Sequence, residues 1–172
     1  MECGYDSFIL FMKNKIAYSE LQLATNFSFL RGASHPHEYA WKAAELGYKA
    51  FGITDYNSLA GVVRGHTAAQ EAGVPFLVGC RIEIDFQGIV KHELAHRSPD
   101  YHRTSILVYP KDRAAYGTLC QLLTYGRRDV SKNEFFLNLR DFLPVQNQFA
   151  TILIPPFFQT LFHHLAPLPD SV

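Results

Sequence analysis

The sequence predicts an α/β fold with a mainly parallel sheet. Two patterns indicate this class: strand-like and helix-like segments alternate along the chain, and the links between them are short. Closed barrels of this class usually need roughly 200 residues or more, whereas this chain has 172. We therefore expect either a part of such a barrel or an open α/β sheet.

The chain begins the pattern with a strand at 17–24 and a helix at 35–49. Pro36 suits the first turn of that helix, because its missing N–H would be unpaired there in any case. Gly47 predicts the end of the helix. Together these residues predict the first strand–helix unit.

The second unit is predicted as a strand at 49–55 and a helix at 57–73. Asn57 or Ser58 can cap the start of this helix, and a glycine ends it. Its inward face is expected to hold Leu59, Val62, Val63 and His66. A histidine on such a face is more typical of packing than of metal binding.

The second half of the chain is predicted to hold three strands and two helices: strands at 74–86, 104–109 and 149–156, and helices at 110–126 and 157–166. Glu83 and Asp85 alternate with apolar residues, so the far end of the third strand is expected to have one wet face. Leu119, Leu122 and Leu123 should face the core from the helix at 110–126.

The composition is that of an ordinary globular protein, with 48% hydrophobic residues and sixteen basic residues balancing sixteen acidic ones. Zero net charge argues against a strongly electrostatic, sequence-independent nucleic-acid binder. A small basic cluster is typical of a solvated turn, although it could contact a DNA backbone: Arg127, Arg128 and Lys132. The cysteines are odd in number and far apart: Cys3, Cys80 and Cys120. Free thiols and the lack of a membrane-length apolar run predict a cytoplasmic protein.

The run HELAH matches the H-E-x-x-H pattern of zinc hydrolases, with His92, Glu93 and His96. On a helix, two histidines four residues apart can bind one zinc ion. Here a proline three residues after the motif would end any such helix, and the motif lies between two predicted strands. We expect an accidental match, with adventitious zinc on His92, His96 and His102 as the alternative.

Three further stretches carry a resemblance to a known family: NFSFLRGASHP, ITDYNSLAGVVR and YGTLCQLLTYGRR. The region 17–156 resembles the PHP (polymerase and histidinol phosphatase) domain, and most of all the one that opens error-prone bacterial DNA polymerases of the replicative alpha-subunit type. The resemblance implies a truncated, distorted (β/α)7 barrel. The implied organisation is an extension at 1–16, a partial PHP domain at 17–156 with an inserted loop or hairpin at 87–103, and a tail at 157–172.

Active PHP domains hold up to three metal ions, often zinc or manganese, on histidine and carboxylate side chains. The resemblance places the corresponding positions of this chain at Gln22, Ala24, Arg31, Asp55, Tyr56, Arg81 and Ser105. Alanine has no donor atom, a glutamine amide is a poor zinc ligand, and arginines repel divalent cations. We expect a degenerate site with no metal cofactor and no catalytic residue.

Two alternatives stay open for this site. Leftover ligands could support a metal-dependent phosphoesterase or proofreading nuclease. Arg31 and Arg81, with the helix start near Asn57, could instead bind a phosphate group or a DNA backbone without metal. The simpler possibility is that each arginine pairs with a carboxylate: Asp55, Glu20 or Glu83.

The resemblance implies a structural function, in which the domain packs against the catalytic core of a translesion polymerase. The implied partners are that core, mutagenesis accessory proteins and the sliding clamp, with DNA contacted only weakly. The polymerase aspartates belong to a palm domain that this chain lacks, so we expect no DNA synthesis by the chain alone. A truncated barrel also leaves an open edge and an apolar inner face. Residues 8–11, residues 157–158 or a second copy of the chain are expected to cover it.

Overall fold

The computed structural model describes residues 17–85, 103–131 and 134–153. Their five strands form one sheet in chain order: β1 (Ser19–Leu23), β2 (Ala50–Tyr56), β3 (Phe76–Asp85), β4 (Arg103–Pro110) and β5 (Phe149–Leu153). Each of the five overlaps a segment for which the sequence predicts a strand. The HELAH motif with His102, the predicted helix at 157–166 and the segments expected to cover the sheet lie outside the described residues.

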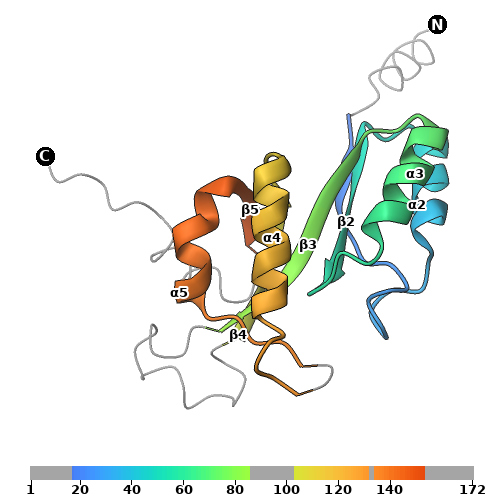
Figure 1. Cartoon of the computed structure of the whole chain (residues 1–172). Coiled ribbons are helices and arrows are strands. Elements are labelled where there is room, and N and C mark those ends of the chain that lie inside the picture. The colour runs from blue at the N-terminus through green and yellow to red at the C-terminus, as the bar shows by residue number, and fades with distance from the viewer. Residues whose placement is uncertain (1–16, 86–102, 132–133, 154–172) are drawn as a thin grey trace, which may run out of the picture.

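Helices follow the strands and pack beside them (Figure 1). They are α2 (Pro36–Glu45), α3 (Val62–Ala72), α4 (Arg113–Tyr125) and the short α5 (Leu139–Phe142), which continues as a 3-10 helix at Leu143–Gln148. The sequence predicts α2, α3 and α4 but not the helical turns at 139–148. In the part of the chain that the structure describes, no helix is both long and apolar enough to span a membrane.

The sheet is mixed, which corrects the prediction of mainly parallel strands. β1, β2 and β3 pair in parallel, whereas the β3–β4 and β4–β5 pairs are antiparallel. Asp85, the last residue of β3, pairs with Arg103, the first residue of β4. The chain therefore re-enters the sheet at the end where it left, so β4 runs antiparallel to β3.

The described helices pack on one face of the curled sheet, as in part of a barrel. Phe76, Cys80, Ile82 and Ile84 are separated by even numbers of residues along β3, so their side chains point to the same face. Phe76 packs with α2 and α3, and the other three belong to the core under α4 and α5. Five strands with helices on one face fit a partial barrel, while the seven-unit barrel stays a prediction.

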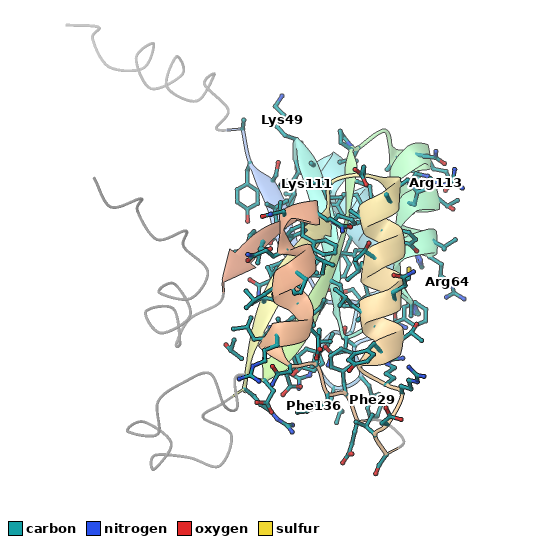
Figure 2. The ribbon with its side chains drawn as sticks, turned by 60° about the vertical axis from the view of Figure 1, so that its left-hand side comes forward. Phe29, Lys49, Arg64, Lys111, Arg113 and Phe136 are labelled. Carbon is teal, nitrogen blue, oxygen red and sulfur yellow. The ribbon has the colours of Figure 1, made fainter. Side chains whose placement is uncertain are left out.

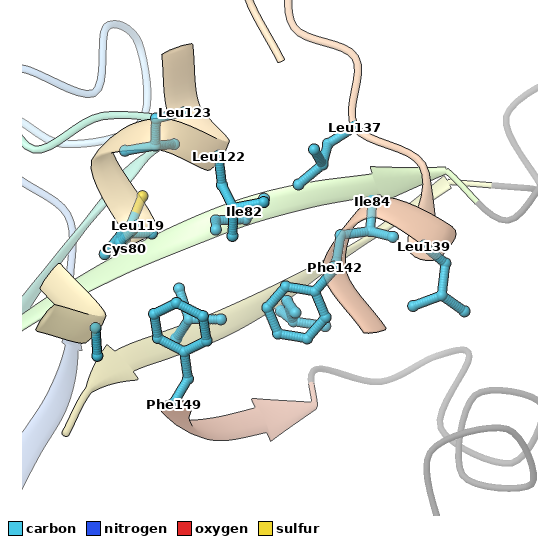
Figure 3. Packing of buried hydrophobic residues seen from close by; sticks show 13 residues of the cluster. Cys80, Ile82, Ile84, Leu119, Leu122, Leu123, Leu137, Leu139, Phe142 and Phe149 are labelled. Atoms are coloured by element: carbon cyan, nitrogen blue, oxygen red, sulfur yellow. The ribbon is translucent and has the colours of Figure 1, made fainter. Parts of the chain in front are cut away.

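The two ends of this core are built from residues of different size. Under α2 and α3, small side chains let the helices lie close to the sheet: Ala40, Ala43, Ala68 and Ala69 pack on Phe51 and Ile53. An added Cβ at Gly65 would lie only 2.6 Å from Ile53 Cδ1. Under α4 and α5, large side chains fill the space (Figure 3), including the predicted inward residues Leu119, Leu122 and Leu123.

Helix α3 begins later than the sequence predicts. Its N-cap is Gly61 rather than Asn57 or Ser58. Asn57 instead has a left-handed backbone, with φ of 50°, and its side-chain Oδ1 accepts a hydrogen bond from the Glu83 N–H. Val62 is buried as predicted, whereas Val63 is 73% exposed. The other buried positions of α3 hold Gly65, Ala68 and Ala69. His66 is exposed, and the centre of its ring lies 6.3 Å from the centre of the Phe76 ring at the edge of the core.

The predicted solvent exposure of one face at the end of β3 is also wrong at one residue. Asp85 is buried rather than exposed, although Glu83 stays partly accessible. The segment before α5 runs across the end of β3, where the Asp85 N–H donates to the Leu137 carbonyl and a bridge joins Asp85 to Asn138. The alternation of residues along β3 cannot predict the burial of Asp85, because the residues that bury it lie about 52 positions later in the sequence.

Candidate functional site

Asp55 lies near the end of β2 with no exposed surface. Its carboxylate accepts hydrogen bonds from three groups. Oδ1 accepts from the Thr25 N–H at 2.8 Å and from Ser28 Oγ at 2.7 Å, and the Thr25 hydroxyl lies 2.9 Å from Oδ1 and 2.8 Å from Oδ2. Gly61 closes the other side, because a Cβ there would lie 2.5 Å from Asp55 Oδ2. We call Asp55, Thr25 and Ser28 the aspartate anchor. It holds the loop after β1 onto the end of β2.

The loop after β1 is tied down further by its own backbone. Ser28 Oγ accepts a hydrogen bond from the Tyr56 N–H at 2.9 Å, while the Ser28 carbonyl accepts from the Arg31 N–H at 2.8 Å. The Asn26 N–H donates to the Ser34 carbonyl across the base of the loop. The loop thus has a defined shape that depends on the buried carboxylate at its centre.

One residue further along β2, Tyr56 points into a different environment. The Arg31 guanidinium carbon lies 3.8 Å from the centre of the Tyr56 ring, a cation–π contact. The Arg81 guanidinium carbon lies 5.8 Å from the same centre, and Arg81 Nε donates to Ser105 Oγ at 2.8 Å. Tyr56 in turn donates its hydroxyl to Glu83 Oε2 at 2.8 Å.

The tyrosine keeps its proton in this setting. Partial burial, followed by the hydrogen bond to Glu83 and the charge of Glu83, raises the pKa of Tyr56 to about 12, against the opposing effect of Arg31 and Arg81. An ionised phenolate, the form that could bind a metal, is therefore disfavoured at neutral pH.

A cleft of about 820 Å³ opens beside Tyr56. Three arginines line it, Arg31, Arg103 and Arg127, together with two carboxylates, Glu83 and Glu134. Arg127 also donates through Nη2 to the Asn57 carbonyl at 2.6 Å, which ties the turn after α4 to the end of β2. We call this the arginine-lined cleft.

The structure brings together some of the predicted site residues and separates others. Arg31, Tyr56, Arg81 and Ser105 form one connected group beside the cleft, with Asp55 beneath it. Gln22 is exposed on β1, and the partly buried Ala24 contributes only its carbonyl, which accepts from the Tyr39 hydroxyl. The carboxylate pairing considered for the arginines is wrong, because Arg31 contacts Tyr56 and Arg81 bonds Ser105.

Sequence reasoning missed four residues that shape the site: Thr25, Ser28, Arg103 and Arg127. Thr25 and Ser28 carry a weak signal, since they are polar residues in an otherwise apolar stretch directly after a strand. Arg127 was assigned to a basic turn, and its contact with Asn57 spans 70 positions. Such a contact has no local signature in the sequence.

The sequence profile of the PHP domain matches residues 20–151. The chain belongs to the PHP domain family.

Relatives of this PHP domain include two bacterial polymerases. The chain is 45% identical over 139 residues to the error-prone DNA polymerase of Caulobacter vibrioides, and 39% identical over 137 residues to error-prone DNA polymerase 1 of Agrobacterium fabrum. The matches cover 81% and 80% of this chain and 11% of each relative, so the chain spans about a tenth of their length. Among solved structures, the chain is similar to an amidohydrolase from Chromobacterium violaceum, a structure with bound sulfate and no metal. The match covers 64% of this chain and 34% of the amidohydrolase chain, with 24% sequence identity and a TM-score of 0.45.

Among the described residues, the side chains at the predicted metal positions do not fit a metal centre. Within residues 17–85, 103–131 and 134–153, no three histidine, cysteine or carboxylate side chains are grouped so that they could hold a metal ion. Asp55, the carboxylate among the predicted metal positions, already has both oxygens engaged by Thr25 and Ser28. Arg31 and Arg81 add positive charge where a divalent cation would need ligands.

Proposed function

We propose that this PHP domain acts without metal as a structural module of an error-prone DNA polymerase. One observation supports the proposal above the others: the Asp55 carboxylate is fully used inside the protein, where it anchors a loop instead of facing an open site. The aspartate thereby has a role that needs no metal ion.

The neighbouring side chains support the same proposal. Multi-metal hydrolysis needs cations that hold phosphate oxygens and generate hydroxide. Here Arg31 lies on Tyr56, and Tyr56 is held protonated by burial and by Glu83. Tyr56 therefore stays neutral with its hydroxyl donated to the Glu83 carboxylate, and this group offers a cation no phenolate ligand.

The structural part of the proposal comes from the relatives. Proteins named error-prone DNA polymerase contain the matching region as 11% of their length. We propose that this domain packs against the remainder of such a polymerase and stabilises it, while the polymerisation chemistry belongs to residues elsewhere. Assembly with accessory proteins of translesion synthesis is part of the same proposal.

Measurement of bound metal tests the proposal that the domain acts without a metal ion. The full chain is purified, incubated with zinc and manganese salts, dialysed and measured for bound metal, with bis(p-nitrophenyl) phosphate as a hydrolysis substrate. The matched control is the His92→Ala/His96→Ala variant, which removes the zinc-protease-like motif. We expect no stoichiometric metal in the variant and no hydrolysis. Tightly held metal in the variant, together with hydrolysis that Asp55→Ala abolishes, would show instead a metal-dependent phosphoesterase or nuclease.

A second candidate function is phosphate binding without metal, favoured by the arginines that share one cleft. Arg31, Arg103 and Arg127 line it, and Arg81 lies beside Tyr56. Guanidinium groups bind phosphate oxygens through paired hydrogen bonds. Titration of single-stranded DNA at several salt concentrations tests this function with Arg31→Ala, Arg81→Ala and Arg127→Ala, and with exposed Arg113→Ala as the control. Binding that only the first three variants weaken supports it, and no binding at low salt excludes it.

A further inference from the structure

The loop after β1 presents two large apolar side chains to solvent. Phe29 is 82% exposed and Leu30 is 90% exposed. Single exposed apolar residues are common on protein surfaces, but adjacent ones on a protruding loop, bordered by charge, are typical of interaction sites. Phe29 lies at the same end of the molecule as Phe136, opposite Lys49 and Lys111 (Figure 2). We call Phe29 and Leu30 the apolar tip.

The apolar tip stands on a loop whose shape is already set. The Ser28 carbonyl accepts hydrogen bonds from the Arg31 and Gly32 N–H groups, which close the turn directly around Phe29 and Leu30. Leu30 itself has a left-handed backbone, with φ of 59°, a conformation that residues other than glycine rarely adopt. Below the turn, the aspartate anchor holds Ser28. A preformed loop loses little conformational entropy on binding, which favours a binding role.

The border of the apolar tip is basic. Arg31 follows it directly in the sequence and is exposed. Arg64 contacts Phe27, two residues before the tip, with its guanidinium carbon 5.4 Å from the centre of the Phe27 ring. An apolar centre edged by arginines is complementary to an apolar pocket edged by acidic side chains.

Nucleic acid fits the tip less well than protein does. Base stacking on a protein surface uses aromatic rings or arginine planes, and Leu30, the more exposed of the two residues, is aliphatic. Leucine and phenylalanine side chains together are better suited to an apolar protein pocket.

We propose that Phe29 and Leu30 insert into an apolar, acid-edged pocket on the body of an error-prone DNA polymerase. The inference rests on the proposed structural function and names the surface through which it acts. The relatives support this occupant, because most of each polymerase polypeptide lies outside the region that matches this chain. The aspartate anchor then has a second consequence, since it sets the position of the tip relative to the partner.

Binding in trans tests the inference. The full chain is coexpressed with the Caulobacter vibrioides polymerase from which the matching region has been removed, and the affinity of the copurified pair is measured. The tested variant is Phe29→Ser/Leu30→Ser. The matched control is Trp41→Ser, which changes an exposed aromatic residue on α2. Because all three side chains are exposed, thermal unfolding of both variants should match the wild type.

We expect the tip variant to bind at least about thirtyfold more weakly, as for an interface hot spot, and the control to bind within about twofold of the wild type. Equal binding by the wild type and the tip variant would overturn the inference while the structural function stands. Failure of the wild-type chain to bind would instead refute the structural function itself. Single-stranded DNA binding that falls steeply with salt and is lost in the tip variant would also overturn the inference, by showing a nucleic-acid contact.

Discussion

Asp55 and Tyr56 are neighbours in the sequence and occupy opposite environments. Asp55 is completely buried and accepts hydrogen bonds from Thr25 and Ser28, whereas Tyr56 is partly exposed beside Arg31. Successive residues of a strand point to opposite faces, so one position along β2 separates the packed side from the open cleft. The two regions are the aspartate anchor and the arginine-lined cleft.

The two environments predict different contributions to the stability of the fold. In the anchor, the acidic residue is needed because it satisfies a backbone N–H and two hydroxyls that would otherwise be buried without partners. In the cleft, the corresponding positions carry arginine and tyrosine, and nothing there requires a cation. The anchor should therefore govern stability and the cleft should contribute little to it.

The largest expected effect is at the centre of the anchor. Asp55→Ala should lower the free energy of unfolding by about 3 kcal/mol or more, because it leaves several buried donors unsatisfied. Urea denaturation measures the change, and exposed Asp129→Ala should stay within about 0.5 kcal/mol of the wild type. A loss below about 1 kcal/mol for Asp55→Ala would remove the distinction between the two regions.

The next effect tests how tightly the anchor is packed. Gly61→Ala should cost about 2 kcal/mol, because the added Cβ would lie 2.5 Å from Asp55 Oδ2 and 3.1 Å from Thr25 Oγ1. Gly117→Ala, inside α4 with no atom near the added Cβ, is the matched control. It should stabilise the protein by up to about 1 kcal/mol, since alanine favours helix over glycine. Equal effects at both glycines would contradict close packing around Asp55.

Tyr56→Phe tests the cleft through pH. At neutral pH the variant should lose about 1 kcal/mol, the worth of the hydrogen bond to Glu83. The pKa of Tyr56 is raised from its ordinary 10.0 to about 12, so folding favours the protonated phenol. The stability that this phenol contributes is present below pH 10 and is lost as pH rises through about 12. Urea denaturation at several pH values should show the difference in unfolding free energy between wild type and variant shrinking from pH 10 to about 12. A difference that stays constant over this range would contradict the raised pKa of Tyr56.

The smallest expected effect is at the rim of the cleft. Arg31→Ala should cost about 0.5 kcal/mol, because a cation–π contact at an exposed site is weak. Thermal or urea unfolding is sufficient to measure it, with exposed Arg113→Ala as the reference. A loss at Arg31 as large as that at Asp55 would show that the cleft is as important for stability as the anchor.

The sequence predicted the units whose signals are local. The strands at β1, β2 and β3 and the helices α2 and α4 follow from apolar periodicity, Pro36 and the glycines that end helices. The direction of β4 could not be inferred, because it depends on how the chain returns at the end of β3. The late start of α3 was also not predicted from the sequence. Asn57 is a residue type typical of a helix N-cap, yet it adopts a left-handed backbone and accepts a hydrogen bond from the Glu83 N–H.

The site was predicted as a set of missing ligands, and its actual contacts required the structure. Arg31 and Arg81 were identified by position, but their partners Tyr56 and Ser105 come from other strands. The anchor was missed because Thr25 lies 30 positions from Asp55. Long-range polar contacts of this kind leave no periodic pattern.

The most direct test of the central claim is the effect of metal on stability. Unfolding of the His92→Ala/His96→Ala protein is measured in EDTA and in manganese chloride, with and without Asp55→Ala. An anchor that needs no metal predicts the same free energy of unfolding in both solutions and an equal loss on Asp55→Ala in each. A metal site would instead stabilise the protein in manganese, by about 2.7 kcal/mol at a hundred times the Kd, and Asp55→Ala would abolish that gain.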